Sequence, residues 1–455
     1  MRSTLPAFDE VWQRQFRSSV LNQIQHFPSE SAFLIGCSGG IDSMLLLHLI
    51  SGLFPEKVRA IYIDHQLQQD SANWGQFVAE QCLLLNVPCL IEAVYVETGN
   101  LEQQARAARY QAYSKHLKPN EILVLAHHQQ DQAETLILRL LSGAGVQGLS
   151  AMRKVDIREQ FTLWRPLLDI SREQICQWAK QLDVQNIQDI SNLNTHYDRA
   201  WCRHELWPVL QNRYPKMQHA LARTSYLMQD ANDILQEIVQ QDLSQCTTAT
   251  EIDLKEIALL SIPRQRQLLS VWMKGQDQYR PSFEMVERLR KEVIGSKSDA
   301  QAALHCNQFY YVRYQQKIYR LSAAEYLAAQ NESDILPETL QVQLDQTFHL
   351  MSGEYCVESN PVGLSTTLLG KNLKLVRRQT GEKIHLQGRV GSWPLKKAIQ
   401  EARIFPWQRH TIQILSIDNV MLGVFTPKGF WLAHSEYCEV GGWQPNLISS
   451  LKKIS

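Results

Sequence analysis

The stretch that decides the fold is Ala32-Phe33-Leu34-Ile35-Gly36-Cys37-Ser38-Gly39-Gly40-Ile41-Asp42-Ser43. Residues 32–37 form a short apolar run typical of a buried strand, and helical spacing of apolar residues begins at Ile41. Between them, Gly39 and Gly40 let the backbone approach a phosphate closely with its N–H groups turned inward. The helix that follows would present its positive N-terminal end to the same anion. The sequence therefore predicts a phosphate-binding loop between a strand and a helix.

The side chains of this loop suit a nucleotide. Ser38 and Ser43 can donate hydroxyl hydrogen bonds, whereas Asp42 would repel phosphate and fits better as a ligand of a Mg²⁺ ion that bridges phosphate oxygens. The loop is not a Walker A motif, because the Gly-Lys-Ser/Thr ending is missing. A plain glycine turn with a helix cap is the alternative. Residues 38–43 resemble the loop of the PP-loop ATPases (N-type ATP pyrophosphatases), which implies that they hold the β- and γ-phosphates while ATP is cleaved to AMP and pyrophosphate.

Strand-like and helix-like segments alternate outward from the loop. The predicted strands are residues 32–37, 58–64, 89–96 and 121–127, and the predicted helices are residues 41–50, 71–86, 100–117 and 131–143. Such alternation predicts a parallel, doubly wound α/β sheet covered on both faces. We assign it to an N-terminal catalytic domain of residues 1–215. Ligands of these sheets bind outside the carboxyl ends of the strands.

Polar residues follow the second and fourth predicted strands. Asp64 and His65 end the second strand, where they could reach a base or ribose or simply cap the surface. His127 follows the fourth strand, and Asp131 and Glu134 lie three apart at the start of a helix, so both carboxylates share a face. The adjacent histidines at 127 and 128 point apart and no cysteine joins them, which argues against zinc. Acids that merely favour a helix N-terminus are the alternative.

Two arginines share another helix face. Arg106 and Arg109 are three residues apart with small alanines between them. Planar guanidinium groups suit phosphate oxygens or the charge of a transition state. A solvated basic helix is the alternative reading.

Several motifs in this order resemble the lysidine synthases. Their V-D-H-x-L pattern matches residues 63–67, A-R-x-x-R-Y matches 105–110, and H-H-x-D-D-Q-x-E-T matches 127–135. A glycine-rich segment at 140–152, a short R-P-L-L at 165–168, a D-x-S-N at 189–192 and an arginine-rich segment at 199–208 follow. The sequence departs from the patterns at Gln130, Ser142 and Ala200. Residues 376–382 and 395–401 resemble the small C-terminal domain of the longer members.

The resemblance implies an adenine nucleotide alpha hydrolase-like fold and a ligase that makes lysidine. ATP and Mg²⁺ would bind at residues 38–43, with Asp64 and His65 beside the nucleotide. The C2 oxygen of the wobble cytidine in the CAU anticodon of tRNA(Ile) would attack the α-phosphorus, and free L-lysine would then displace AMP.

Asp131 and Glu134 would bind metal or the lysine amines, and Asp131, Glu134 or His127 would accept a proton. Asp42 and Arg106 complete the expected catalytic set. The alternatives are another PP-loop tRNA-modifying enzyme, such as a thiolase, or an inactive RNA-binding relative.

The rest of the chain is expected to bind tRNA. Residues 216–330 look mostly helical, with a hairpin at 305–321, and residues 345–455 look like a small α+β domain with a helix at 394–404. Positive charge gathers in two stretches: residues 371–409 hold ten Lys and Arg against two acids, and residues 264–320 hold eleven against five. Basic surface of this kind attracts phosphate. The expected RNA contacts are Arg199, Arg203, Arg377, Arg378, Lys396 and Lys397.

Composition limits the remaining choices. The 455-residue chain has zero formal net charge and nine scattered cysteines without a C-x-x-C pair. A disulfide framework and a cysteine metal site are therefore not expected. Neither a signal peptide nor an apolar run long enough for a membrane span is recognisable, which points to the cytoplasm. The family resemblance also suggests a homodimer.

Overall fold

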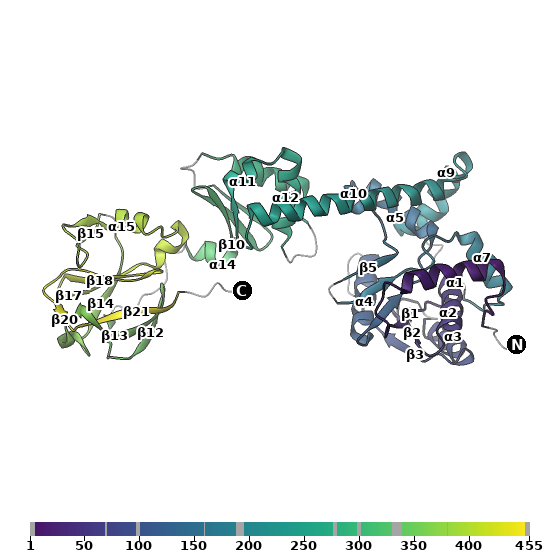
Figure 1. Cartoon of the computed structure of the whole chain (residues 1–455), viewed down its shortest axis with the longest axis horizontal. Coiled ribbons are helices and arrows are strands. Elements are labelled where there is room, and N and C mark those ends of the chain that lie inside the picture. The colour runs from purple at the N-terminus through teal and green to yellow at the C-terminus, as the bar shows by residue number, and fades with distance from the viewer. Residues whose placement is uncertain are drawn as a thin grey trace. The chain divides into compact units, whose positions relative to one another are not determined.

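The computed structural model describes residues 5–68, 71–96, 101–158, 160–187, 195–275, 280–297, 302–329, 339–379 and 381–450 (Figure 1). The chain divides into two compact units, Met1–Glu237 and Ile238–Ser455, and the division falls inside helix α10 (Met217–Cys246). Each unit is described by itself below. The three-domain division expected from the sequence remains a prediction.

A six-stranded sheet organises the first unit. Its strands are β1 (Ala32–Gly36), β2 (Val58–Asp64), β3 (Cys89–Ala93), β4 (Glu121–Val124), β5 (Val155–Ile157) and β6 (Thr162–Trp164). The order is β3-β2-β1-β4-β6-β5, with all pairs parallel except the antiparallel edge strand β5. The predicted parallel α/β sheet is confirmed, although β3 and β4 each end three residues earlier than predicted. The chain order reverses between β1 and β4, which is where such sheets bind ligands.

Helices cover both faces of this sheet, as Figure 1 shows. They are α1 (Val11–Ile24), α2 (Ile41–Leu53), α3 (Ser71–Leu84), α4 (Leu101–His116) and α7 (Arg172–Gln181). The other helices of this unit are α5 (Gln129–Leu141), α6 (Val146–Leu149), α8 (Asp198–Trp201) and α9 (Trp207–Arg213), with a π-helical turn η2 (Cys202–Leu206) between α8 and α9, and α5, η2 and α9 share a small core of their own. Alternate residues of β1 point to opposite faces: Phe33 and Ile35 pack with α2, whereas Leu34 packs with Tyr113 of α4. Apolar strands buried on both faces fix the register of the sheet and hence the positions of the loops at its carboxyl end.

The second unit begins with an antiparallel sheet in the order β7-β10-β9-β8. Its strands are β7 (Glu251–Asp253), β8 (Ala303–Cys306), β9 (Phe309–Tyr314) and β10 (Lys317–Ser322), and its helices are α11 (Leu254–Ala258), α12 (Ile262–Lys274), α13 (Phe283–Arg288), α14 (Ala323–Ala328) and the π-helical turn η3 (Leu289–Ile294). The β9–β10 pair confirms the predicted hairpin. Trp272 and Tyr311 pack in the core that joins α12 to this sheet.

Three further antiparallel sheets, of five, four and two strands, form the end of the second unit. The strands are β11 (Thr339–Leu340), β12 (Thr347–Leu350), β13 (Gly353–Leu364), β14 (Leu373–Arg377), β15 (Lys383–Ile384), β16 (Trp393–Pro394), β17 (Gln413–Ile417), β18 (Val420–Thr426), β19 (Gly429–Leu432), β20 (Cys438–Val440) and β21 (Trp443–Ser450), with short 3₁₀ turns η4 (Thr366–Leu368) and η5 (Pro406–Thr411). Helix α15 (Leu395–Glu401) confirms the helix predicted near residue 394. This part is therefore α+β, as expected.

Helix α10 is 30 residues long but carries polar residues along its length. Within the described ranges, we find no helix that combines the length and the apolar character needed to cross a bilayer.

Candidate active site

Hydrogen bonds to the side chain of Ser43 hold the two ends of the loop after β1 together. The Ser38 N–H donates to Ser43 Oγ at 3.1 Å, and Ser43 Oγ donates to the Gly40 carbonyl at 2.9 Å. Gly39 has a φ of +84°, and a Cβ there would lie 2.9 Å from Ile187 Cδ1. The Ile187 N–H also donates to the Gly39 carbonyl at 2.9 Å. A glycine is therefore required at position 39 by both conformation and space.

The start of α2 leaves room for an anion. Gly40 is the N-cap residue of α2 and supplies no side-chain cap. A Cβ on Gly40 would meet only Ser38 Oγ, at an ordinary 3.6 Å, so the space outside this position is open. Backbone N–H groups in the first turn of a helix have no partner within the helix. The loop thus offers donors and the positive end of a helix dipole at an open surface.

Asp42 has an unsatisfied carboxylate oxygen. Among the described residues, its Oδ1 is buried without a hydrogen-bond partner and lies 3.8 Å from His128 Nε2, while Oδ2 lies 3.8 Å from Arg172 Nη1. A buried carboxylate oxygen normally has a partner. Within the part of the chain that the structure describes, no cluster of three potential metal ligands exists. A single carboxylate beside a phosphate loop fits Mg²⁺, which takes most of its ligands from phosphates and water.

Asp131 is open to the cavity. Its Oδ2 accepts a hydrogen bond from the His128 N–H at 3.0 Å, and its Oδ1 lies 3.5 Å from Arg203 Nη2. Burial acts to raise the pKa of Asp131, but the neighbouring imidazoles of His128 and His127 and this hydrogen bond outweigh it, so the pKa is lowered. Asp131 is therefore a partly accessible carboxylate at the start of α5.

Glu134 differs sharply from Asp131. It is fully buried, and Arg203 binds both its oxygens, from Nε to Oε1 and from Nη2 to Oε2, each at 2.9 Å. Gln130 Nε2 also donates to Oε1 at 2.9 Å. The predicted shared face is real, because Arg203 contacts both carboxylates. The two acids are nevertheless not equivalent, since the oxygens of Glu134 are already occupied. The amide of Gln130, where the family pattern has Asp, adds a donor instead of a second buried negative charge.

His127 is a neutral hydrogen-bond acceptor. Its Nδ1 accepts from Arg165 Nε at 3.3 Å. Burial lowers its pKa to about 3, and the positive charge of Arg165 acts in the same direction. With Nδ1 accepting from Arg165, the proton of the neutral ring lies on Nε2, so neither ring nitrogen of His127 has a free lone pair for a second proton. Asp131, an ionised carboxylate that faces the larger cavity, is better placed to accept a proton.

His65 and Arg109 form a pair on the cavity wall. Arg109 Nε and Nη2 lie 3.3 and 3.2 Å from His65 Nε2. Burial and the charge of Arg109 lower the pKa of His65 to about 4, and its Nδ1 is buried without a hydrogen-bond partner. By contrast, Asp64 Oδ1 accepts from the Gln66 N–H at 2.8 Å, which is the capping role given above as its alternative. His65 is therefore a neutral imidazole that positions Arg109 on the cavity wall.

Arg106 and Arg109 have different surroundings on α4. The guanidinium of Arg106 is 5.0 Å from the centre of the Tyr110 ring, and Arg106 is not among the described residues that line the cavities below. Arg109 lines both of them. Arg109 is therefore the better placed of the two arginines, and the role expected of Arg106 stays a prediction.

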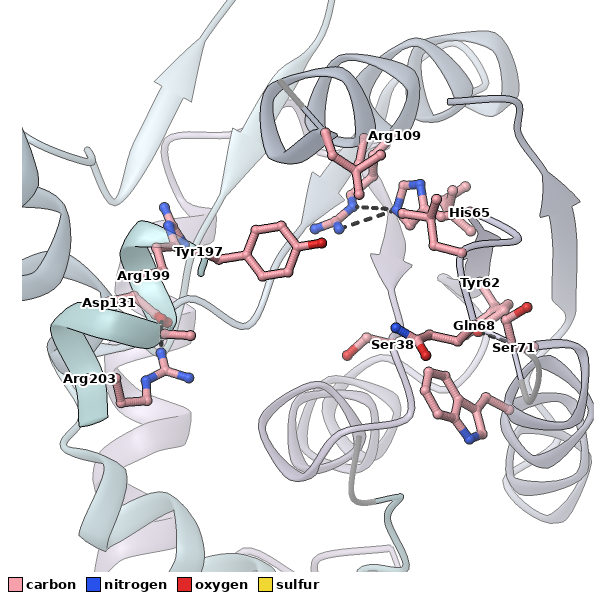
Figure 2. A pocket seen from close by; sticks show the side chains of 16 residues that line it. Ser38, Tyr62, His65, Gln68, Ser71, Arg109, Asp131, Tyr197, Arg199 and Arg203 are labelled. Atoms are coloured by element: carbon pink, nitrogen blue, oxygen red, sulfur yellow. Dashed lines mark hydrogen bonds and ion pairs between the residues drawn. The ribbon is translucent and has the colours of Figure 1, made fainter. Parts of the chain in front are cut away.

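Two adjoining cavities, of about 570 and 290 Å³, lie at the carboxyl end of the sheet. The residues that line both are Ser38, Tyr62, Ile63, His65, Trp74 and Arg109. The smaller cavity adds Asp42, Ser43 and His127, and the larger adds Asp131 and Arg203. Figure 2 shows Ser38, His65 and Arg109 on one side of the larger cavity and Asp131 and Arg203 on the other. The phosphate loop and the open carboxylate therefore face one continuous space.

Sequence reasoning missed the aromatic residues of this space. Tyr197 lines the larger cavity beside Arg199, a predicted RNA contact, and Trp74 lines both cavities. Tyr197 stands two residues before Arg199 in the arginine-rich segment, which was the available signal. The D-x-S-N motif at 189–192 lies outside the described residues.

The basic residues predicted in the second unit lie at its surface. Lys396 and Lys397 are exposed on α15, and Arg377 and Arg378 are half-buried at the end of β14. Lys397 Nζ lies 5.1 Å from the centre of the Trp393 ring. We call the exposed part of residues 371–409 the basic surface.

Three family models match the chain. They are a PP-loop domain at residues 11–210, a TilS substrate binding domain at 252–319 and a TilS substrate C-terminal domain at 373–435. The chain is 60% identical over 454 residues to the tRNA(Ile)-lysidine synthase of Acinetobacter baylyi, covering 100% of this chain and 99% of that protein. It is 32% identical to the tRNA(Ile)-lysidine synthase of Haemophilus ducreyi (88% and 95% covered) and 32% identical to that of Chromobacterium violaceum (93% and 97% covered).

Proposed function

Because this chain belongs to the tRNA(Ile)-lysidine synthase family, we propose that the two adjoining cavities are where it forms lysidine. The protein is an ATP-dependent ligase that makes a carbon–nitrogen bond on tRNA(Ile). One observation carries the assignment of the site: the phosphate loop and the open carboxylate of Asp131 border the same space. A nucleotide held at the loop and an amine held at Asp131 would therefore meet over a single base.

In the first step, residues 38–43 hold the terminal phosphates of ATP through backbone N–H groups and the hydroxyls of Ser38 and Ser43. Asp42 would hold Mg²⁺ with its unpaired Oδ1, and the ion would neutralise phosphate charge. The C2 oxygen of the wobble cytidine in the CAU anticodon attacks the α-phosphorus, and pyrophosphate leaves.

The charge that develops at the α-phosphate needs fixed donors. Arg109 is the group best suited, since it borders the space shared by the two cavities and His65 holds it there. We assign this role to Arg109 in preference to Arg106, which stacks on Tyr110 outside the cavities.

In the second step, the amine of free L-lysine attacks C2 of the adenylated base. The bond from C2 to the adenylate oxygen breaks, AMP leaves, and the nitrogen loses a proton. Asp131 supports this step because its carboxylate is ionised and partly open, so it can hold the ammonium group and accept the proton.

Glu134 and Arg203 are assigned a positioning role. Their two-point ion pair joins α5 to η2, and Arg203 also faces Asp131 at 3.5 Å. Such a pair fixes the orientation of the carboxylate that binds substrate. Arg203 is thus withdrawn from the expected RNA contacts, whereas Arg199 is kept.

The rest of the tRNA would be held by phosphate contacts that carry no sequence information. Arg377, Arg378, Lys396 and Lys397 are the candidates, because they lie on the basic surface. Assembly as a homodimer belongs to the same proposal and would be tested by sedimentation of the purified protein.

The experiment that tests the function uses labelled L-lysine, ATP and tRNA(Ile) with the full chain. Acid-precipitable label should appear only when all components are present, with one pyrophosphate released per lysine joined. Release of pyrophosphate without lysine incorporation would point to another acceptor chemistry, such as thiolation. If neither pyrophosphate release nor lysine incorporation occurred, the protein would be an inactive RNA-binding relative.

A further inference from the structure

The reaction brings two nucleobases into one site, the adenine of ATP and the target cytosine. Single-stranded bases are commonly held by stacking on aromatic side chains, because every base presents a flat face. The described residues that line the two cavities include four such rings, from Tyr62, Trp74, Tyr113 and Tyr197. The contacts of each ring show whether one of its faces is free to stack on a base.

Two of the rings are packed into the protein. Tyr62 is buried, its hydroxyl donates to the Ser71 carbonyl at 2.9 Å, and its ring lies against Gly75. Tyr113 is buried in the core beneath α4 and meets Tyr110 edge-to-face at 6.1 Å. Neither ring has a face free for a base.

The other two rings lie on different walls. Trp74 comes from α3, is half-buried and lines both cavities, including the one formed by the phosphate loop. Tyr197 is the N-cap residue of α8 and lines only the larger cavity, together with Asp131 and Arg199. In Figure 2 the Tyr197 ring projects into the cavity toward Arg109 and His65. The Tyr197 ring is thus on the side where the amine must reach the base.

The backbone of Tyr197 is anchored by a hydrogen bond, whereas its side chain is not held by a polar or ring contact with any described residue. Its carbonyl accepts from the Trp201 N–H at 2.9 Å, which anchors it to the first turn of α8. Within the described part of the chain, its side chain makes no hydrogen bond, ion pair or ring contact, and it is half-buried. A large ring that projects into the cavity and has no such partner among the described residues is suited to a partner that arrives with the substrate.

We propose that Tyr197 is the residue on which the wobble cytosine stacks. This inference rests on the function proposed above and names the residue that would orient the base in it. With the base flat against this ring, its C2 edge faces the space between the phosphate loop and Asp131. Trp74, which also lines the cavity of the phosphate loop, is then the ring available to stack on the adenine of ATP.

Substitutions of Tyr197 give the first test. The kcat/KM for tRNA(Ile) should fall roughly ten- to hundredfold in Tyr197→Ala and in Tyr197→Leu, which keeps bulk without an aromatic face. Tyr197→Phe should stay within about twofold of the unchanged protein, and the KM values for ATP and lysine should change little in every variant. Tyr214, an exposed tyrosine that follows α9 and lines neither cavity, gives the control Tyr214→Ala.

Fluorescence gives the second test, without turnover. A tRNA(Ile) with pyrrolocytosine at the wobble position should be quenched on binding to the unchanged protein and to Tyr197→Phe, and much less on binding to Tyr197→Ala. Equal quenching in Tyr197→Ala, or a Tyr197→Leu variant as active as Tyr197→Phe, would overturn the proposal. If the unchanged protein joined no lysine at all, the proposed function would fail instead, so the two failures are distinguishable.

Discussion

The cavity of the first unit and the basic surface of the second hold charge in opposite ways. At the cavities, Asp42 and Asp131 are partly buried, and Glu134 is fully buried behind them; each faces a cation or an imidazole within 4 Å. On the basic surface, Lys396 and Lys397 are exposed to solvent, which screens them. The contribution of a buried charge depends on its distance from a single partner, whereas exposed charges attract a ligand through their combined effect. Single substitutions should therefore be decisive in the first region and graded in the second.

The largest effect is expected at Asp42. Asp42→Ala removes the oxygen best suited to Mg²⁺ and should lower lysine incorporation by at least about a hundredfold. Binding of tRNA should change less than twofold, because the tRNA is held mainly elsewhere. Filter binding and incorporation assays measure the two effects, and Asp230→Ala, on the exposed side of α10, is the matched control. An equal loss of tRNA binding would show that the loop is structural.

A large effect on stability is expected at Glu134. Glu134→Gln leaves the guanidinium of Arg203 with only the more distant carboxylate of Asp131 and should cost about 2 kcal/mol of unfolding free energy. Thermal unfolding measures this, with the exposed Glu205→Gln on η2 as the control. A normal melting temperature combined with a KM for lysine raised more than tenfold would contradict the positioning role and make Glu134 a direct ligand.

The buried histidines should make stability depend on pH. The folded-state pKa values of His65 and His127 are about 4 and about 3, below the ordinary value near 6.5 of an unfolded chain. Between pH 6.5 and 4 the unfolded chain therefore binds more protons, so stability falls as pH falls through this window. His127→Gln should flatten the fall. Melting temperatures at pH 4.5 and 7.5 measure it, and an unchanged slope would show that His127 does not contribute.

The smallest effect is expected on the basic surface. Lys396→Ala with Lys397→Ala should weaken tRNA binding several-fold and reduce the slope of log affinity against log salt by between 1 and 2. The control pair is Lys57→Ala with Lys118→Ala, which precede β2 and β4 and so lie at the end of the sheet away from the cavities. If the control changed the slope as much, the basic surface would have no special role.

Local patterns predicted the elements around the phosphate loop well. The range of β2 was predicted without error and α2 began at the predicted Ile41, because both carry dense apolar signals. Strands β5 to β8 were missed, since three- and four-residue strands carry little periodic signal and depend on pairing with distant residues.

The candidate site was predictable in residue type but less so in geometry. Ser38, Asp42 and Asp131 meet at the cavities because parallel strands end at one edge. The oxygens of Glu134 are bound by Arg203, which lies 69 residues away in the sequence. No local sequence pattern predicts such a pair. The different surroundings of Arg106 and Arg109 have a similar cause, since only the packing of α4 decides which of two neighbouring arginines lines the cavities.

The π-helical turn η2 is the place near this site where the helix can lose a residue with least disturbance. From Asp198 to Arg213 the backbone is continuously helical, and η2 takes up an extra residue relative to a regular α-helix. Deletion of one residue inside η2 would restore regular α-helical bonding, so Trp207 would keep its face toward the core that it shares with α5. The same deletion in the regular helix α9 would instead rotate everything beyond it by about 100° and turn an inner face outward.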